Sequence, residues 1–580
     1  IGYSLNIIVL FGLILVLGLF VDDAIVVVET IDYHKKQGKK HLEAIKEGIN
    51  AVGVADVAGT LTTVLAFAPL LMISGILGEF ISPIPTTVII ALVFSLLIAL
   101  SIIPYLADLL IPDKNQNLVN SKLISNITGI VNYFSDLVIK AGNKVADLIN
   151  FYLGKWYLLG VVLFVALILI GVGGYFAGLL KFSVFPPQKD SAGMMVTITY
   201  QNGTSVQEKE QIADRVEEVL SRDYADVIEK ANYVFVGVNQ FGVDLAQIDI
   251  PLVERSERER TSVEIADSLQ KDLAMIEEAR ITATEYQTGA GSEEFSFKMQ
   301  IYDEDSQILA SSAEVFSGYI ETIELDNDVE ILETKVDYVG AIAKKDNRRY
   351  VEVAAKISDP TDSGALLEIE EKVLEKYDSN GLENLGLGED SLGFDKGIES
   401  DNLEAFNSAA VALGVAILLM YVILVIQFDS FLQPLLIFLA FPFSFIGLFP
   451  GLYATDNAMS FFVMVGIIAL VGIVVNNTIM LLDFIRQERD KGNDPRKSAV
   501  EAVRIRFRPL VTTSVTTVVG LLPLALTDPL WESLAFSIVF GLIASTTMVI
   551  FVFPAYYVAL ETGIQGTKNL FSRLSGKILG

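Results

Sequence analysis

The sequence predicts a multi-pass α-helical membrane protein that carries an α+β domain outside the membrane. The chain has 580 residues, of which 52% are hydrophobic, and its mean hydropathy of +0.50 is too high for a soluble protein of this size. Nine apolar stretches of about 18 to 26 residues are each long enough to cross a bilayer as a helix. One long segment, residues 181–404, is instead strongly acidic, with 49 Asp and Glu against 21 Lys and Arg.

The apolar stretches fall into three groups: three before residue 112, one near residues 156–181 and five after residue 404. They run from Ile7 to Val28, Val52 to Ser74, Thr86 to Leu110, Trp156 to Leu180, Phe406 to Ile426, Leu432 to Tyr453, Ser460 to Leu482, Pro509 to Leu526 and Leu534 to Ala559. Pro and Gly inside these stretches are compatible with membrane helices, because neighbouring helices satisfy the freed backbone groups.

Basic residues in the short loops predict which side of the membrane faces the cytoplasm. Residues 32–48 contain five Lys and residues 486–508 contain eight Lys and Arg, whereas the loops near residues 75–85, 454–459 and 527–533 contain none. Basic loops stay on the cytoplasmic side. The acidic segment is therefore expected outside the cytoplasm, and the tail at residues 563–580 inside it.

The residue types that most enzymes and metal sites need are scarce. The chain has no Cys and only two His, His34 and His41, which excludes disulfides, thiolate metal sites and His-based catalytic triads within it. No GxxxxGK[ST] phosphate-binding loop occurs, so ATP hydrolysis is not expected. The net charge of −29 argues against binding to nucleic acid. We expect neither enzymatic activity nor a bound cofactor or metal.

Two predicted membrane segments, 454 positions apart, form an internal sequence repeat. GLFVDDAIVVVETI begins at Gly18 and GIVVNNTIMLLDFI begins at Gly472. The same offset matches residues 62–64 to residues 516–518 and Pro69 to Pro523, without a gap. Internal duplication is typical of secondary transporters, whose sites lie where the repeats meet.

The two copies differ where an ionisable pair in one becomes a neutral pair in the other. Asp22 and Asp23 correspond to Asn476 and Asn477. A carboxylate at the centre of a membrane helix costs about 2.5 to 3.5 kcal/mol on insertion scales, so two adjacent ones indicate a function. Burial and mutual repulsion disfavour the ionisation of both. We expect the pair to load and release a proton; the alternative is a pair that only joins helices through hydroxyl and amide partners.

Side chains on the duplicated helices offer partners for the acidic pair. Gly18 and Gly472 precede the Asp and Asn pairs by one turn, where a missing side chain lets two backbones approach so that the pairs face each other. Arg506 and Arg508 stand at the cytoplasmic end of the eighth stretch, and either reach the carboxylates or extend to the interface. Threonine hydroxyls come from two stretches: Thr60, Thr62 and Thr63 in the second, and Thr512, Thr513, Thr516 and Thr517 in the eighth.

The remaining segments show two further patterns. Residues 121–155 carry apolar side chains three and four positions apart, which suits either a helix at the cytoplasmic interface or a helix packed against its neighbours. In the acidic segment strand-like and helix-like stretches alternate, with helices expected near residues 206–220, 261–276, 306–323 and 366–377. Four such units predict two split βαβ subdomains.

Together these segments resemble the resistance-nodulation-division transporters, in particular their hydrophobe and amphiphile efflux branch. The matching segments follow the same order along nearly the whole chain: GLFVDDAIVVVET (18–30), VFPPQKDSAGMMVTITYQNGTS (184–205), QFDSFLQPL (427–435), GIVVNNTIMLLDF (472–484) and RIRFRPLVTTSVTTVVGLLPLAL (504–526). The resemblance implies twelve membrane helices in two halves, each half with an outer loop of ferredoxin-like porter subdomains. The nine stretches would be the fourth through twelfth helices, and the chain, which begins at Ile1 inside an apolar run, the C-terminal part of a longer protein.

The resemblance also assigns roles to individual residues. It implies that Asp22 and Asp23 carry the family's proton-relay acids, and that Arg506 and Thr513 match its relay positions on the eleventh helix. Asn476 stands where the best-known drug pumps have a lysine, which leaves the coupling ion, proton or sodium, open.

The sequence thus predicts a secondary active exporter of hydrophobic or amphiphilic compounds in a bacterial cytoplasmic membrane. The resemblance implies a homotrimer, but between Val329 and Val351 there is no room for the insertion that docks a periplasmic adaptor. The alternatives are a protein-translocation accessory of the same superfamily and a non-transporting assembly subunit. The expected domains are residues 1–111 with three membrane helices, a cytoplasmic amphipathic connector at 112–155, a membrane helix at 156–181, a porter domain at 182–404, five membrane helices at 405–562 and a cytoplasmic tail at 563–580.

Overall fold

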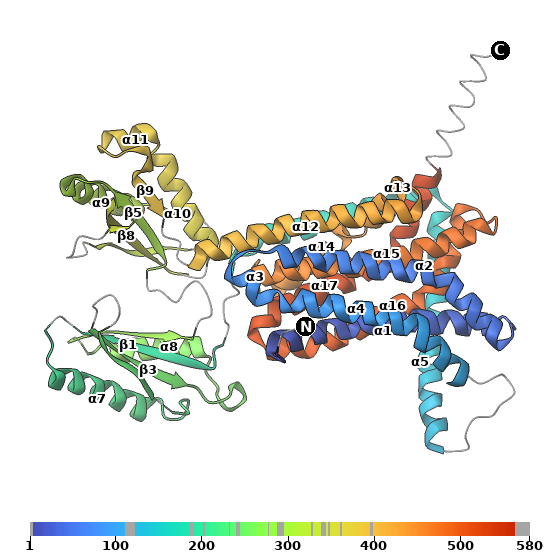
Figure 1. The fold of residues 1–580 in the computed structure, drawn as a ribbon, viewed down its shortest axis with the longest axis horizontal. Coiled ribbons are helices and arrows are strands. Elements are labelled where there is room, and N and C mark those ends of the chain that lie inside the picture. Colours follow the sequence, from blue (N-terminus) through green and yellow to red (C-terminus); the bar gives the residue numbers. More distant parts are fainter. Residues whose placement is uncertain are drawn as a thin grey trace, which may run out of the picture. The chain divides into compact units, whose positions relative to one another are not determined.

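A computed structural model of the chain divides it into two units (Figure 1). The first, called the membrane unit for its apolar helices, comprises Ile1–Leu180 and Asp401–Gly580; the second, called the outer unit after its predicted location, comprises Lys181–Ser400. The structure describes residues 4–110, 122–184, 190–200, 203–230, 232–238, 244–276, 278–286, 295–325, 329–337, 344–345, 348–359, 362–394 and 398–562. The predicted tail at 563–580, the start of the connector and part of the segment between Val329 and Val351 lie outside these residues.

Within the described residues, nine helical segments are long and apolar enough to cross a membrane, which confirms the predicted number. The sixth is interrupted, since Pro442 begins a new helix after a short break. The nine are α1 (Ile7–Lys36), α2 (His41–Phe67), α4 (Pro83–Leu110), α6 (Trp156–Leu179), α12 (Ile398–Phe428), α13 with α14 (Leu432–Phe438 and Pro442–Ala454), α15 (Phe461–Asp490), α16 (Pro495–Thr527) and α17 (Pro529–Phe551). A 3-10 turn at Ala68–Met72 and α3 (Gly75–Ile81) join α2 to α4.

The start of α16 differs most from the sequence prediction. The apolar stretch begins at Pro509, but the helix begins at Pro495, where a proline at the first turn needs no hydrogen-bond donor. Polar and charged residues therefore continue the helix by almost four turns beyond its apolar part. As a result Arg506 lies inside α16 and not at its end.

α15 is the most enclosed membrane helix. Its side chains are buried on every face from Phe461 to Phe484 with few exceptions, and it packs against α2, α16 and α17. By contrast, α6 buries only Ala166 and Gly173 among its residues. A helix that is apolar all round and buried all round belongs at the centre of a bundle.

The amphipathic stretch forms α5 (Lys122–Leu153), and its second half packs against α16. Gly142 lies against the ring of Phe507, since a Cβ built there would come within 2.9 Å of that side chain. Arg504 pairs with Asp147 at 3.2 Å. Of the two placements that the sequence left open, contact with a neighbouring helix is therefore present for this half of α5.

The outer unit contains two antiparallel sheets with the same connectivity. The first sheet has the order β2-β3-β1-β4 and the second the order β6-β8-β5-β9, with β7 paired to β8. Their strands are β1 (Gly193–Thr199), β2 (Asn232–Val238), β3 (Asp244–Pro251), β4 (Arg280–Glu285), β5 (Phe297–Tyr302), β6 (Ile331–Asp337), β7 (Lys344–Lys345), β8 (Arg348–Ile357) and β9 (Leu392–Phe394).

Two helices accompany each sheet, close to the predicted positions. They are α7 (Val206–Asp223) and α8 (Ser262–Leu273) in the first module, and α9 (Ser306–Ile320) and α10 (Ser363–Lys376) in the second, where α11 (Ser379–Asn384) follows. In the first module Val196 and Ile248 of the sheet share a buried core with Leu269 of α8. Capping boxes at Ser205 and Thr261 fix the starts of α7 and α8.

A buried arginine ties the start of β1 to the start of α8. Arg258 is only 8% exposed and pairs with Asp190 at 2.8 Å, and it also donates to the carbonyl oxygens of Ser191 and Val253. We expect Arg258→Met to destabilise the outer unit by about 2 to 3 kcal/mol, because buried polar partners lose a charged donor.

The measurement is the temperature at which protease cleaves residues 181–400 in the intact protein. Arg215→Met is the matched control, because Arg215 pairs with Glu278 at 3.0 Å on the surface, where such a pair contributes about 0 to 1 kcal/mol. Equal cleavage temperatures for the two variants would contradict the prediction.

Candidate ion-coupling site

A small cavity lies among α1, α2, α15 and α16 in the interior of the membrane unit. Its volume of about 20 Å³ is enough for one water molecule. It brings together all six residues that the sequence analysis assigned to ion coupling, from both copies of the repeat. The cavity is lined by Asp22, Asp23, Val26, Asp56, Asn476, Asn477, Met480, Arg506, Pro509, Leu510 and Thr513.

The two acids of the pair have different surroundings. Asp23 accepts hydrogen bonds from the hydroxyls of Ser95 at 3.1 Å and Thr60 at 3.5 Å. The Ser95 hydroxyl also reaches the Phe20 carbonyl at 2.9 Å, and one hydroxyl proton cannot serve both acceptors fully. Asp22 is 5% exposed, and its Oδ1 has no hydrogen-bond partner. Asp22 is therefore the acid of the pair with a free oxygen available for a proton.

A third carboxylate, Asp56 on α2, lines the same cavity and was missed by the sequence analysis. It is 3% exposed, and its Oδ2 has no hydrogen-bond partner. A signal was present: an acid inside an apolar stretch is itself a functional hint. The repeat offset of 454 gives Leu510 as its counterpart, so this acid is not part of the duplicated design.

Arg506 and Arg508 behave differently. Arg506 is 2% exposed, its guanidinium lies 3.8 Å from the centre of the Phe484 ring, and its Nε and Nη2 atoms have no hydrogen-bond partner. Arg508 instead pairs with Glu29 of α1 at 3.0 Å. The sequence analysis treated the two arginines alike, because it placed both at the helix end; the structure brings only Arg506 to the cavity with the acids.

The two predicted packing glycines make the same contact in opposite copies of the repeat. A Cβ built on Gly18 of α1 would lie 2.8 Å from the Thr517 Cα of α16, and one built on Gly472 of α15 would lie 3.3 Å from the Thr63 Cα of α2. Thr63 and Thr517 are themselves counterparts at the offset of 454. Each glycine therefore faces the threonine helix of the other repeat and not the other glycine helix.

A third close contact involves a glycine that the sequence analysis did not consider. A Cβ on Gly59 of α2 would lie 1.8 Å from Oδ1 of Asn476, so the asparagine amide occupies the space that any side chain there would need. Gly59 thereby lets an amide from the neutral copy sit against α2, three residues from Asp56.

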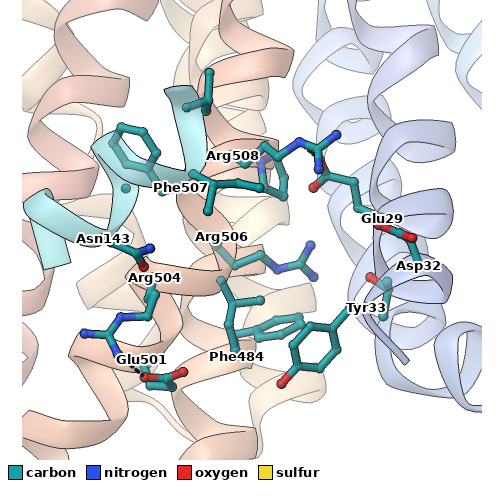
Figure 2. Close-up of a pocket in the computed structure, with 16 residues that line it drawn as sticks. Glu29, Asp32, Tyr33, Asn143, Phe484, Glu501, Arg504, Arg506, Phe507 and Arg508 are labelled. Atoms are coloured by element: carbon teal, nitrogen blue, oxygen red, sulfur yellow. Dashed lines mark hydrogen bonds and ion pairs between the residues drawn. The ribbon is translucent and has the colours of Figure 1, made fainter. Parts of the chain in front are cut away.

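A larger cavity of about 320 Å³ lies among α1, α5, α15 and α16, and Arg506 borders both cavities. Figure 2 shows the Arg508 side chain reaching Glu29 of α1, while the Arg506 side chain extends beside Phe484. The lining of the larger cavity includes acidic and basic side chains: Glu29, Asp32, Glu501, Arg504, Arg506 and Arg508. Among the described residues, no group of three or more acids or histidines is arranged to hold a metal ion.

Comparison with known proteins gives the family. The AcrB/AcrD/AcrF family matches this chain over residues 1–330 and 314–561, so the chain belongs to this family of resistance-nodulation-division permeases. This confirms the resemblance found in the sequence. The swarming motility protein SwrC of Bacillus subtilis (strain 168) is 23% identical over 651 aligned positions, which cover 96% of this chain and 59% of SwrC. The chain thus spans less than two thirds of the length of that relative.

The contact at Gly18 leads to a stability prediction. We expect Gly18→Ala to lower the stability of the membrane unit by about 1 to 3 kcal/mol, because the added methyl group overlaps the α16 backbone at Thr517. The measurement is the temperature at which half of the detergent-solubilised protein aggregates.

Gly171→Ala is the control, since Gly171 lies in the membrane helix α6 and a Cβ there meets no atom within 4 Å. If both variants aggregate at the wild-type temperature, α1 and α16 are not held together by this contact.

Proposed function

We propose that this chain provides the coupling part of a secondary active efflux transporter, in which protons move through the Asp22 and Asp23 pair. One observation carries the proposal. The two acids line one small cavity with Arg506 and with Asn476 and Asn477 of the other repeat, among helices that are long enough to cross a membrane. Family membership supports the same class of activity.

Protonation changes the charge within this cavity and thereby the forces between four helices. The contacts of Gly18 with Thr517 and of Gly472 with Thr63 pack α1 closely against α16 and α15 closely against α2. A close-packed interface shifts as a unit when the charge inside it changes, because it cannot deform smoothly. One charge crossing about 100 mV supplies about 2.3 kcal/mol, an adequate source for such a shift.

We infer that the larger cavity is the cytoplasmic access to the site. Arg506 lines both cavities. A change of charge on an acid in the small cavity therefore acts on a side chain that also lines the larger cavity. The larger cavity is also lined by Asp32 and Glu501, which adjoin the two basic loops that the charge rule assigns to the cytoplasm.

The outer unit is proposed as the porter domain. Each module runs β-α-β-β-α-β along the chain, with an additional short strand in the second, and this order supports ferredoxin-like porter subdomains. Movement of this domain would expel a hydrophobic or amphiphilic compound from a bacterial cytoplasmic membrane. A homotrimer with a periplasmic adaptor is consistent with the family, and the adaptor would have to bind without a docking insertion near β6 and β8.

The central test is Asp22→Asn in the full-length protein, reconstituted into vesicles with a pH-sensitive dye inside. Ethidium, a cationic amphiphile, serves as the transported probe. We expect proton flow that depends on ethidium to fall to the level of protein-free vesicles, because the amide cannot take up a proton. Asp136→Asn, which alters an exposed acid on α5 that lines neither cavity, should leave the flow unchanged. Undiminished flow in the Asp22→Asn variant would exclude the proposed mechanism.

The sidedness of the larger cavity is open to direct labelling, because this chain has no cysteine of its own. Asn143 is exposed and lines that cavity. We expect a membrane-impermeant maleimide to label Asn143→Cys in inside-out vesicles but not in intact cells, and to label Glu217→Cys of the outer unit in spheroplasts. The reverse pattern would place the larger cavity on the outer side.

A further inference from the structure

Asp56 stands out because it is a buried acid that the repeat does not require. The counterpart of Asp56 in the second copy is Leu510, and both residues line the small cavity. Asp56 is 3% exposed, and its Oδ2 has no hydrogen-bond partner. Packing does not explain an acid that is present in only one copy of a duplicated helix. Leu510 shows that an apolar side chain is accommodated at the equivalent position of the other repeat.

The charges of the cavity cannot all be present at once without a large cost. Asp22, Asp23 and Asp56 would supply three negative charges, and Arg506 is the one basic residue among the described lining residues, which leaves a net charge of −2. The cavity has room for about one water, so solvent screens this charge poorly. Protons on the acids relieve the imbalance most directly, and the acids do not converge as metal ligands.

Asp56 connects the acidic pair to the arginine. Its charge interacts with Asp23 of α1 and with Arg506 of α16. Arg506 in turn interacts with Asp483 of α15 and Glu29 of α1. Asp22 of α1 also interacts with the charge of Asp56. Asp56 therefore lies electrostatically between the acidic pair and the residue that borders the larger cavity.

A fixed ion pair between Asp56 and Arg506 is the alternative to a changing charge. Such a pair would satisfy the donors and acceptors on both side chains. Instead Oδ2 of Asp56 and both Nε and Nη2 of Arg506 have no hydrogen-bond partner, although both side chains are more than nine-tenths buried. This arrangement suits an acid that is neutral in one state and charged in another, with Arg506 as its partner in the charged state.

We propose that Asp56 is a third proton-carrying residue of the coupling site, placed between the Asp22 and Asp23 pair and Arg506. The inference deepens the proposed function, on which it rests for its role in transport. The site then holds three exchangeable carboxyl groups, and a proton leaving the pair passes to Asp56 before it reaches the larger cavity beside Arg506.

The test counts protons taken up by the purified full-length protein when the pH is lowered through the neutral range, where exposed carboxylates stay ionised. We expect Asp56→Asn to take up one proton fewer per chain than the wild type, and Asp56→Glu to restore the count. Asp136→Asn, at an exposed position of α5 outside both cavities, controls for loss of a surface acid. An unchanged count in Asp56→Asn overturns the proposal, because the charge of Asp56 would then be constant.

Two further measurements make the test independent of folding and of the proposed function. Asp56→Leu introduces the residue type found at the equivalent position of the other repeat, Leu510. If Asp56→Asn does not fold, the number of protons taken up by Asp56→Leu tests the proposal instead. Proton uptake needs neither substrate nor gradient, so it stands even if Asp22→Asn leaves ethidium transport unchanged.

Discussion

The membrane unit depends on the burial of several ionisable groups in one place where water is nearly excluded. Three acids and one arginine share a cavity of about 20 Å³, and the low polarity of their surroundings makes every change of charge energetically large. Hydroxyls from α2 and α4 stabilise Asp23, whereas Asp22, Asp56 and Arg506 keep polar atoms without partners. Such a site is stable only within a limited set of protonation states, and in the proposed mechanism this restriction links proton movement to helix position.

The internal repeat explains how the surrounding helices hold this site. The contact of Gly18 with Thr517 and that of Gly472 with Thr63 are one contact made twice, with the roles of the repeats exchanged. The scaffold is therefore nearly symmetric, while the chemistry is not: acids occupy one copy, and amides and Leu510 occupy the matching positions of the other. Because the packing is nearly symmetric and the acids lie in one copy only, a single change of charge acts on one repeat more than on the other.

Hydropathy predicted the number of membrane helices, the repeat pointed to the Asp and Asn pairs, and the resemblance of five segments predicted the family and the candidate roles of Arg506 and Thr513. They did not locate Arg506 correctly, because hydropathy ends where charged residues begin, whereas the helix continues to Pro495. They also missed Asp56 and Gly59. Both lie on α2 at positions where the two copies differ in kind, Asp56 against Leu510 and Gly59 against Thr513, so a search for matching polar pairs passed over them. The contact between α2 and α15 is a tertiary contact, which the pattern of residues in one sequence does not reveal.

The enclosure of α15 has a consequence for biogenesis. Two of the helices that surround it, α16 and α17, come later in the chain, and only α2 among its main neighbours precedes it. During synthesis the flanks of α15 that these two helices cover become shielded by them only after α16 and α17 have been made. The small cavity, which needs α16 for one wall, is therefore completed late in membrane assembly. In the proposed mechanism, no proton path through this site therefore exists before α16 has inserted.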